Sequence, residues 1–202
     1  MSVATVQETA NAICLKGSTE ILAEYFEYAV HTIIYQRGIY PSETFERQQK
    51  YGLTLFVSTD ASIKEFVEIS VRQAKEWIQK SLVKDLSLLM MDAHSHEVLE
   101  RGEKRSKKPL KTIQAEIGAV LRQITSAISF LPLLDRRCIF DVQFVLKSSV
   151  ESENIPPAWE ELQTKAMPAN PQTVPFRSFS TGLHQVDSGV SYKLEEEKSV
   201  MN

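Results

Sequence analysis

The chain has 202 residues, of which 43% are hydrophobic and 24% are charged, which suits one domain with a buried core and argues against wholesale disorder. A net charge of −3 at pH 7 gives no general attraction to nucleic acid or to an anionic membrane. The two cysteines, Cys14 and Cys138, lie far apart and outside any C-x-x-C pair, so we expect no disulfide and a reducing compartment such as the cytosol or nucleus.

The beginning of the chain shows no basic segment followed by a hydrophobic stretch, so we do not expect a signal peptide. No hydrophobic run approaches the roughly 18 residues that suggest a membrane-spanning helix.

The first expected helix runs from Ser18 to about Gln36. Ser18 is a residue type that caps helix N-termini, and Gly38 stands where a left-handed residue commonly follows a helix. The hydrophobic residues recur at intervals of three and four, as on one helix face. They are Ile21, Leu22, Tyr25, Phe26, Ala29, Val30, Ile33 and Ile34.

Two further helices are expected, from about Asp60 to Lys80 and from about Leu110 to Phe130. The N-terminus of the second helix has two candidate caps, either Asp60 or the pair Ser62 and Glu65. Pro132 is expected to end the third helix. Their inward faces are expected to be Ile63, Phe66, Val67, Val71, Ala74, Trp77 and Ile78 in the second, and Ile113, Ile117, Val120, Leu121, Ile124 and Ile128 in the third.

Strands are expected between and after these helices. Val83–Met91 has strand length, residues 92–96 form a polar turn, and Glu97–Arg101 returns, which predicts a hairpin. Cys138–Lys147 alternates in the manner of a half-buried strand. One face holds Cys138, Phe140, Val142, Phe144 and Leu146, and the other holds Asp141, Gln143 and Lys147.

The stretch from Ser148 to Pro175 contains five of the eight prolines and no sustained period. Connections longer than about 12–15 residues without structure are uncommon in compact domains and are usually functional or disordered. Trp159 lies within it and needs a pocket. Strand-like segments resume at Val174–Thr181 and Leu183–Leu194. We therefore expect a pair of strands on a long tether, able to dock in more than one place.

No residues suggest catalysis or a cofactor. The glycines are scattered, no G-K-[ST] phosphate loop is present, and no Ser, Cys or His has a recognisable nucleophile setting. His94 and His96 suggest a metal only weakly, because a third ligand with standard spacing is missing. The basic run from Lys104 to Lys108 is interpreted as a solvated loop, with an import signal or a patch for an acidic partner as alternatives.

Several runs of the sequence closely resemble the spindle-checkpoint branch of the HORMA-domain family. These runs are Lys16–Ile21, Ile34–Phe45, Lys50–Leu55, Glu97–Arg101, Leu121–Thr125, Phe130–Leu134, Arg177–Ser180 and Leu183–Val186. The resemblance covers residues 13–194. It implies an α+β fold in which three helices pack on a mainly antiparallel sheet. A core of about 13–147 would precede a mobile C-terminal element of about 148–194, called the safety belt, with flexible termini at 1–12 and 195–202.

In this family the safety belt docks in two positions, giving open and closed conformers. The closed one holds a partner peptide along the strand that is here Cys138–Lys147. The resemblance therefore implies a non-enzymatic checkpoint adaptor that delays anaphase, located in the nucleus, at kinetochores and in the cytoplasm. The implied partners are a coiled-coil mitotic arrest scaffold protein at kinetochores and the cell-division-cycle co-activator of the anaphase-promoting complex. Neither nucleic acid nor membrane is an expected partner.

The site residues expected from the alternating strand and the resemblance form two groups. Peptide contacts are expected from Phe140, Val142, Phe144, Leu146, Trp159, Phe179, His184, Val186 and Tyr192. A homodimer of open and closed conformers is expected to form through Arg122, Gln123 and Phe130. Exposed charges usually contribute little to binding, so a solvated Arg122 and an ordinary core Phe130 are the alternative interpretation.

Two other functions remain as hypotheses. A different HORMA adaptor, such as the DNA polymerase zeta accessory subunit or a meiotic axis protein, would keep the fold and change the partner. A hydrolase or metal enzyme has no motif to support it. The sequence also departs from the family at the short Gly102–Leu110 connection, which we expect to favour the open conformer and to slow conversion.

Overall fold

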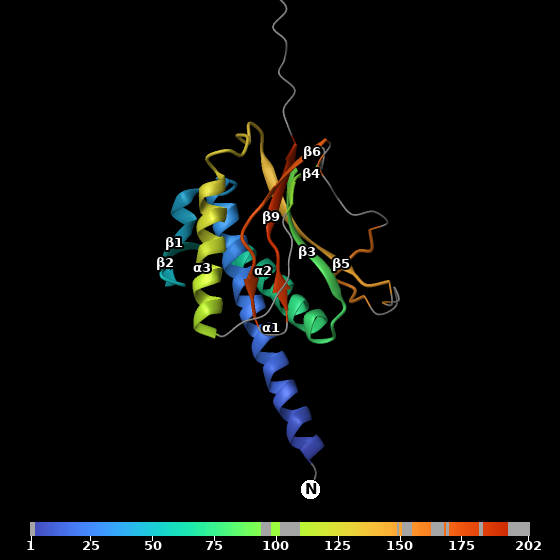
Figure 1. Ribbon diagram of the computed structural model, residues 1–202. Coiled ribbons are helices and arrows are strands. Elements are labelled where there is room, and N and C mark those ends of the chain that lie inside the picture. Colours follow the sequence, from blue (N-terminus) through green and yellow to red (C-terminus); the bar gives the residue numbers. More distant parts are fainter. Residues whose placement is uncertain are drawn as a thin grey trace, which may run out of the picture.

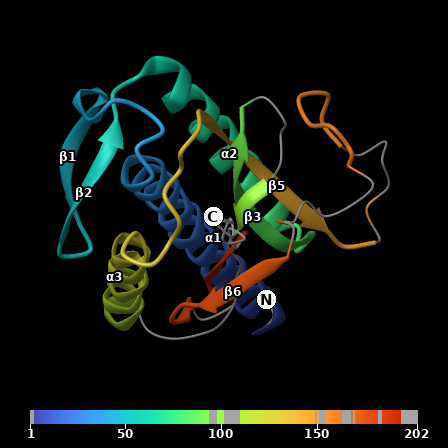
Figure 2. The ribbon, with the colours of Figure 1, turned by 90° about the horizontal axis from the view of Figure 1, so that it is seen from above.

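The computed structural model describes residues 3–93, 98–101, 110–148, 150, 155–162, 168, 170–181 and 184–193, with side chains described in these ranges except at 3–16, 98–101, 110 and 180. Three α-helices lie on one face of an antiparallel sheet, with α1 between α2 and α3 (Figures 1 and 2). The helices are α1 (Val3–Gln36), α2 (Ala61–Gln79) and α3 (Leu110–Ala127), and a short 3-10 helix η1 spans Ser42–Thr44.

Helix α1 begins at Val3, well before the expected start at Ser18, and takes in most of the segment 1–12 that we expected to be flexible. Ser18 is therefore inside the helix and buried, at 3% exposure, so its expected role as an N-terminal cap is wrong. At the other end the expectation is confirmed, because Gly38 adopts a φ of +60°, which a residue without Cβ adopts readily.

Helix α2 has the expected boundaries. Of the two candidate caps, Asp60 is the one used: its carboxylate accepts hydrogen bonds from the backbone N–H groups of Ser62 and Ile63. Helix α3 ends at Ala127, before the expected Phe130, since the chain tightens into a turn in which Phe130 and Leu131 both donate to the Ala127 carbonyl. Ile128 consequently leaves the inward face and is 40% exposed, so its expected place in the core is wrong.

The main sheet has five strands in the order β5-β3-β4-β9-β6, and each neighbouring pair is antiparallel. The expected hairpin is β3 (Val83–Asp92) and β4 (Val98–Arg101). Strand β5 (Cys138–Leu146) pairs with β3 from Asp92↔Cys138 to Val83↔Leu146. β5 is an edge strand, and no strand of the described residues pairs with its outer side.

The C-terminal strands differ from the expected pair of continuous strands. Strand β6 (Pro171–Pro175) pairs with β9 (Gly189–Lys193), while β7 (Phe179–Ser180) pairs with β8 (Gln185–Val186) in a separate two-stranded sheet. We refer to residues 171–193 as the C-terminal hairpin. Strand β6 lies within the stretch that we expected to be irregular. Its two prolines are tolerated because they stand at the ends of an edge strand, where a missing N–H matters little.

A hairpin of β1 (Phe45–Lys50) and β2 (Leu53–Ser58) was not expected from the sequence. Its turn places Tyr51 and Gly52 at φ 52° and 69°, the left-handed values of a tight hairpin turn. Helix α3 packs closely on this turn, since a Cβ on Gly118 would lie 2.9 Å from the Tyr51 carbonyl oxygen.

The core lies between the helices and the sheet. Its inner members come from all three helices, from β3 and from the C-terminal hairpin: Leu22, Val30 and Ile34 of α1, Val67 and Ala74 of α2, Ile117, Val120 and Leu121 of α3, Met90 of β3, and Phe179 and Val186 of the hairpin. The tip of the C-terminal hairpin is thus part of the core.

Candidate functional site

The outer edge of β5 is a candidate peptide-binding site. An edge strand presents backbone N–H and C=O groups that an added extended peptide can pair with. Two aromatic side chains of β5 are held against α2. Phe140 lies edge-on to Phe66, with centroids 5.2 Å apart, and Phe144 lies edge-on to Trp77 at 5.0 Å. The strand is therefore anchored to α2 on its helix-facing side, and its outer edge borders no other strand within the part of the chain that the structure describes.

Residues 155–162 place Trp159 beside the same strand. A turn forms here, in which the Trp159 N–H donates to the Pro156 carbonyl at 2.9 Å. The indole ring lies 5.0 Å from the Phe144 ring and 5.7 Å from the Trp77 ring. These ring contacts leave Trp159 half-buried and attach the segment after β5 to the edge strand.

An acidic pair lies at the site. Asp141 of β5 is exposed, yet nearby atoms remove part of the water around its carboxylate, and this desolvation raises its pKa. The Val142 N–H, which donates to Asp141 Oδ1 at 2.7 Å, opposes the shift, and the Glu160 carboxylate adds to it. Glu160 therefore adds a small repulsion to the desolvation of the Asp141 carboxylate, and a cation placed near both groups would offset it.

The nine expected peptide-contact residues do not all gather at β5. Phe140, Phe144, Leu146 and Trp159 lie along it or beside it, whereas Val142 points into the core at 5% exposure. Phe179, His184 and Val186 lie at the tip of the C-terminal hairpin. Tyr192 lies in β9, where it pairs with Glu100 of β4, and donates its hydroxyl to Gln172 Oε1 at 2.7 Å.

The hairpin tip docks on α1 through contacts that the sequence analysis missed. Ser18 Oγ lies 2.6 Å from Thr181 Oγ1 and 2.7 Å from His184 Nδ1. The Tyr25 ring meets the Phe179 ring edge-on at 4.7 Å, and its hydroxyl lies 3.1 Å from Ser188 Oγ. Burial raises the pKa of Tyr25 to about 12. The sequence hinted at this docking contact only through Ser18, which precedes the periodic hydrophobic residues of the helix and was interpreted as a helix cap.

The three expected dimer residues lie on one side of the molecule. Arg122 is exposed on α3, and Phe130 is 45% exposed just beyond its end, 6.4 Å from the Tyr192 ring. Gln123 Oε1 accepts a hydrogen bond of 2.6 Å from the Arg177 backbone N–H. This surface therefore combines α3 with the C-terminal hairpin.

Other candidate sites receive no support from the described residues. Within the ranges that the structure covers, no three His, Cys, Asp or Glu side chains are grouped as metal ligands, and His94 and His96 lie outside those ranges. The same holds for the basic run at 104–108. None of the described helices is both long enough and apolar enough to cross a membrane.

Residues 18–102 match the model of the HORMA domain. The fold and the site described above are therefore those of a HORMA-domain protein. The structure superposes on a chain from the crystal structure of a mitotic checkpoint complex with a TM-score of 0.81 and 34% identity, covering 88% of this chain and 99% of that one. The structure of C. elegans HTP-2 bound to a HIM-3 closure motif shares the fold at a TM-score of 0.76 and 11% identity, with 87% of this chain and 90% of that chain covered.

Sequence relatives narrow the class. The mitotic spindle assembly checkpoint protein MAD2A of Dictyostelium discoideum is 41% identical, covering 92% of this chain and 95% of the relative. The human protein of that name is 42% identical, with 90% and 93% covered. The chain belongs to the MAD2 family of spindle assembly checkpoint proteins. A more partial match is MAD2B of Danio rerio, which is 30% identical with 48% of this chain and 46% of the relative covered.

The C-terminal hairpin is docked on the main sheet, where β9 pairs with β4 at Glu100↔Tyr192 and Arg101↔Ser191. We refer to this arrangement as the closed position of the hairpin. We expected the short connection before α3 to disfavour this arrangement. Residues 102–109 of that connection lie outside the described residues, and the bias in populations stays a prediction.

Proposed function

We propose that this checkpoint protein is an adaptor that binds an extended partner peptide along the outer edge of β5 and encloses it beneath the safety belt, residues 148–194. The observation that carries the proposal is the outer edge of β5, along which no strand of the described residues pairs, with the Trp159 ring 5.0 Å from the Phe144 ring beside it. The partners proposed are the cell-division-cycle co-activator of the anaphase-promoting complex and the coiled-coil kinetochore scaffold, and sequestering the former delays anaphase. The domain proposed for this role is 13–194.

Main-chain pairing supplies affinity in this mode of binding, and side-chain pockets supply specificity. Enclosure adds a kinetic barrier, because the peptide is held on one side by β5 and on the other by the segment that carries Trp159. Ordering a chain costs about 1–2 kcal/mol per backbone residue. The burial of Phe179 and Val186 and the pairing of β6 with β9 help to offset that cost for the belt.

The adaptor is proposed to act by binding alone, without catalysis, nucleic acid or membrane, in the nucleus, at kinetochores and in the cytoplasm. A homodimer between open and closed conformers is proposed to use Arg122, Gln123 and Phe130. The hydrogen bond from Arg177 to Gln123 supports this, since it couples the proposed dimer surface to the position of the C-terminal hairpin.

Calorimetry with a co-activator peptide tests the proposal. Trp159→Ala is the sharper variant, because a deletion from Gly182 onward also removes Val186 and Val190 from the core. Buried interfacial tryptophans contribute about 2 kcal/mol or more, so we expect affinity to fall at least about thirtyfold. Leu162→Ala, which truncates a side chain that is 60% exposed in the same segment, is the matched control. Equal affinity of Trp159→Ala and the unmodified protein would contradict the proposal.

A further inference from the structure

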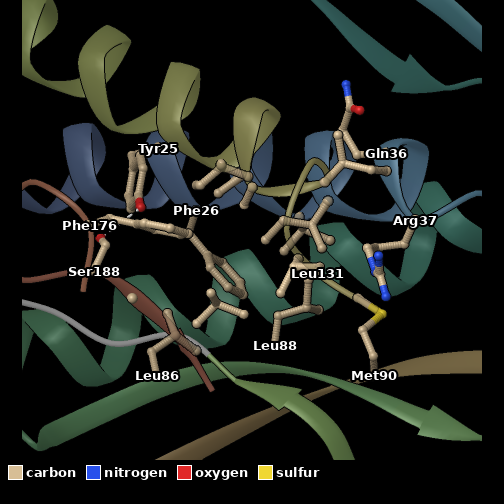
Figure 3. A pocket seen from close by; sticks show the side chains of 18 of the residues that line it. Tyr25, Phe26, Gln36, Arg37, Leu86, Leu88, Met90, Leu131, Phe176 and Ser188 are labelled. Carbon is tan, nitrogen blue, oxygen red and sulfur yellow. Dashed lines mark hydrogen bonds between the residues drawn. The ribbon is translucent and has the colours of Figure 1, made fainter. Parts of the chain in front are cut away.

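A cavity of about 110 Å³ lies between the helices, the sheet and the C-terminal hairpin, away from the outer edge of β5. We refer to it as the hairpin cavity. Figure 3 shows Leu86, Leu88 and Met90 of β3 on one side and α1 on the other, with Phe176 and Ser188 of the hairpin at one end. Arg37 and Gln36 lie at the opposite end.

The lining is almost wholly apolar. Thirteen of its nineteen residues are Ala, Val, Leu, Ile, Met or Gly, and two more are Phe26 and Phe176. The four polar residues are Tyr25, Gln36, Arg37 and Ser188. The Tyr25 hydroxyl lies 3.1 Å from Ser188 Oγ, and the Arg37 guanidinium donates to the Pro132 carbonyl at 2.7 Å. Apolar cavities of about 150 Å³ lined by Leu, Ile and Phe remain dry and bind benzene or xenon. The hairpin cavity is of the same order in size and chemistry.

The wall comes from two parts of the chain. Helices α1 and α3 and strand β3 supply most of it, and the C-terminal hairpin supplies Phe176, Val186, Ser188, Gly189 and Val190. The hairpin is held there by the contacts of Ser18 and Tyr25 described above. If the hairpin leaves, one wall of the cavity goes with it.

A ligand also has a route to the interior. Ile128, just beyond the end of α3, is exposed, whereas the other lining residues are buried or half-buried, including Leu131. This end of the cavity is therefore the one nearest to solvent.

We propose that the hairpin cavity is a binding site for a small uncharged apolar molecule about the size of one aromatic ring, and that its occupant holds the C-terminal hairpin in the closed position. The effect of the ligand on the position of the hairpin follows from thermodynamic linkage between binding and docking. A ligand that binds only the arrangement with the hairpin docked shifts the equilibrium toward that arrangement by a factor of one plus the ratio of the ligand concentration to its dissociation constant. The site does not depend on peptide binding at β5, and its test uses no peptide.

Benzene is the probe. Titration into the protein, followed by methyl NMR, is expected to give saturable shifts of Leu86, Leu88 and Ile124 and intermolecular NOEs from these methyls to benzene. At a benzene concentration twice the dissociation constant, hydrogen exchange of the amides of β8 and β9 is expected to slow about threefold, while the amides of the β1–β2 hairpin exchange unchanged.

Two variants on α3 complete the test. Ala127→Leu adds a side chain inside the cavity, since Ala127 lines it at 3% exposure, and is expected to abolish the benzene shifts. Ala115→Leu makes the same change on the exposed face of α3 and is expected to leave them intact. An absence of NOEs and of saturable shifts in the unmodified protein overturns the site, whether or not Ala127→Leu folds. Saturable binding without slower exchange in the C-terminal hairpin overturns the linkage.

Discussion

Ser18 of α1 and Thr181 of the C-terminal hairpin, 163 residues apart in the sequence, place their hydroxyl oxygens 2.6 Å from each other in a buried contact. His184 Nδ1 lies 2.7 Å from the same Ser18 oxygen. One serine in a helix therefore serves two polar groups of the hairpin tip. Because Ser18 belongs to α1 and the other two residues to the hairpin tip, the contact joins the hairpin to the helix layer in this arrangement.

Replacing Ser18 with Ala is expected to destabilise the closed position by about 1–3 kcal/mol, since Thr181 and His184 each lose a partner in a buried setting. The measurement is hydrogen exchange of the amides of β7 and β8, together with urea unfolding. Ser62→Ala changes an exposed serine in the first turn of α2 and controls for helix propensity. Exchange at the hairpin tip that is as slow in Ser18→Ala as in the unmodified protein would show that the contact contributes nothing.

Acid is expected to destabilise the protein through His31. This residue is 2% exposed, and burial, followed by the charge of Lys64, lowers its pKa to about 4. The unfolded chain, with a pKa near 6.5, binds the proton first as the pH falls. Stability is therefore lost from about pH 6.5 downward until the folded pKa is passed.

The measurement for His31 is urea unfolding at pH 7.5 and pH 5.0. His31 alone is expected to lower the free energy of unfolding by about 2 kcal/mol at pH 5.0 relative to pH 7.5. Glu27 and Asp141 have raised pKa values and act in the opposite direction, so the quantity to compare is the difference between the unmodified protein and His31→Gln. An identical pH dependence in the two proteins would refute the assignment.

The acidic pair at β5 predicts a preference for peptides with a cationic side chain near Asp141 and Glu160. Glu160→Gln is expected to weaken binding of a lysine- or arginine-containing peptide by about 1 kcal/mol, with less effect at high salt, because exposed charges are screened. The same variant is expected to lower the pKa of Asp141, because the Glu160 carboxylate contributes to raising that pKa. An NMR titration of Asp141 measures this change. Glu161→Gln, at the next exposed position, serves as the control, and equal effects of the two variants would count against the pair.

Self-association is expected to depend on Arg122. A charge reversal, Arg122→Glu, places a carboxylate at the centre of the proposed dimer surface, where buried arginines often dominate binding. Sedimentation is expected to show a monomer with a nearly unchanged melting temperature, because Arg122 is exposed in the single chain. Lys111→Glu, another exposed reversal on α3, is expected to leave the dimer intact. A persisting dimer of Arg122→Glu would place the interface elsewhere.

Much of the fold was predictable from local patterns. Most of the inward faces of α2 and α3, the Asp60 cap, the β3–β4 hairpin and the extent of β5 depend on neighbours within a few residues, and the helical and strand periods report such neighbours directly. Two face assignments were wrong, because Phe66 of α2 is 36% exposed and Gln143 of β5 is buried. The long proline-containing stretch with Trp159 also indicated a segment that needs a separate binding surface. Together with the runs shared with the HORMA family, these patterns determined the fold class and the candidate edge strand.

The tertiary structure alone decided what the distant segments do. Ser18 has the local setting of a helix cap, and only the arrival of Thr181 and His184 makes it a docking contact. Phe179 and Val186 have the spacing of peptide-facing strand residues, yet they become core because the hairpin tip turns onto α1 and α3. The hairpin cavity likewise exists only where the two parts of the chain meet. The physical reason is that an alternating or helical period specifies which side of an element is apolar, whereas the surface that covers that side is chosen among distant segments by packing and by the entropy of closing the loops between them.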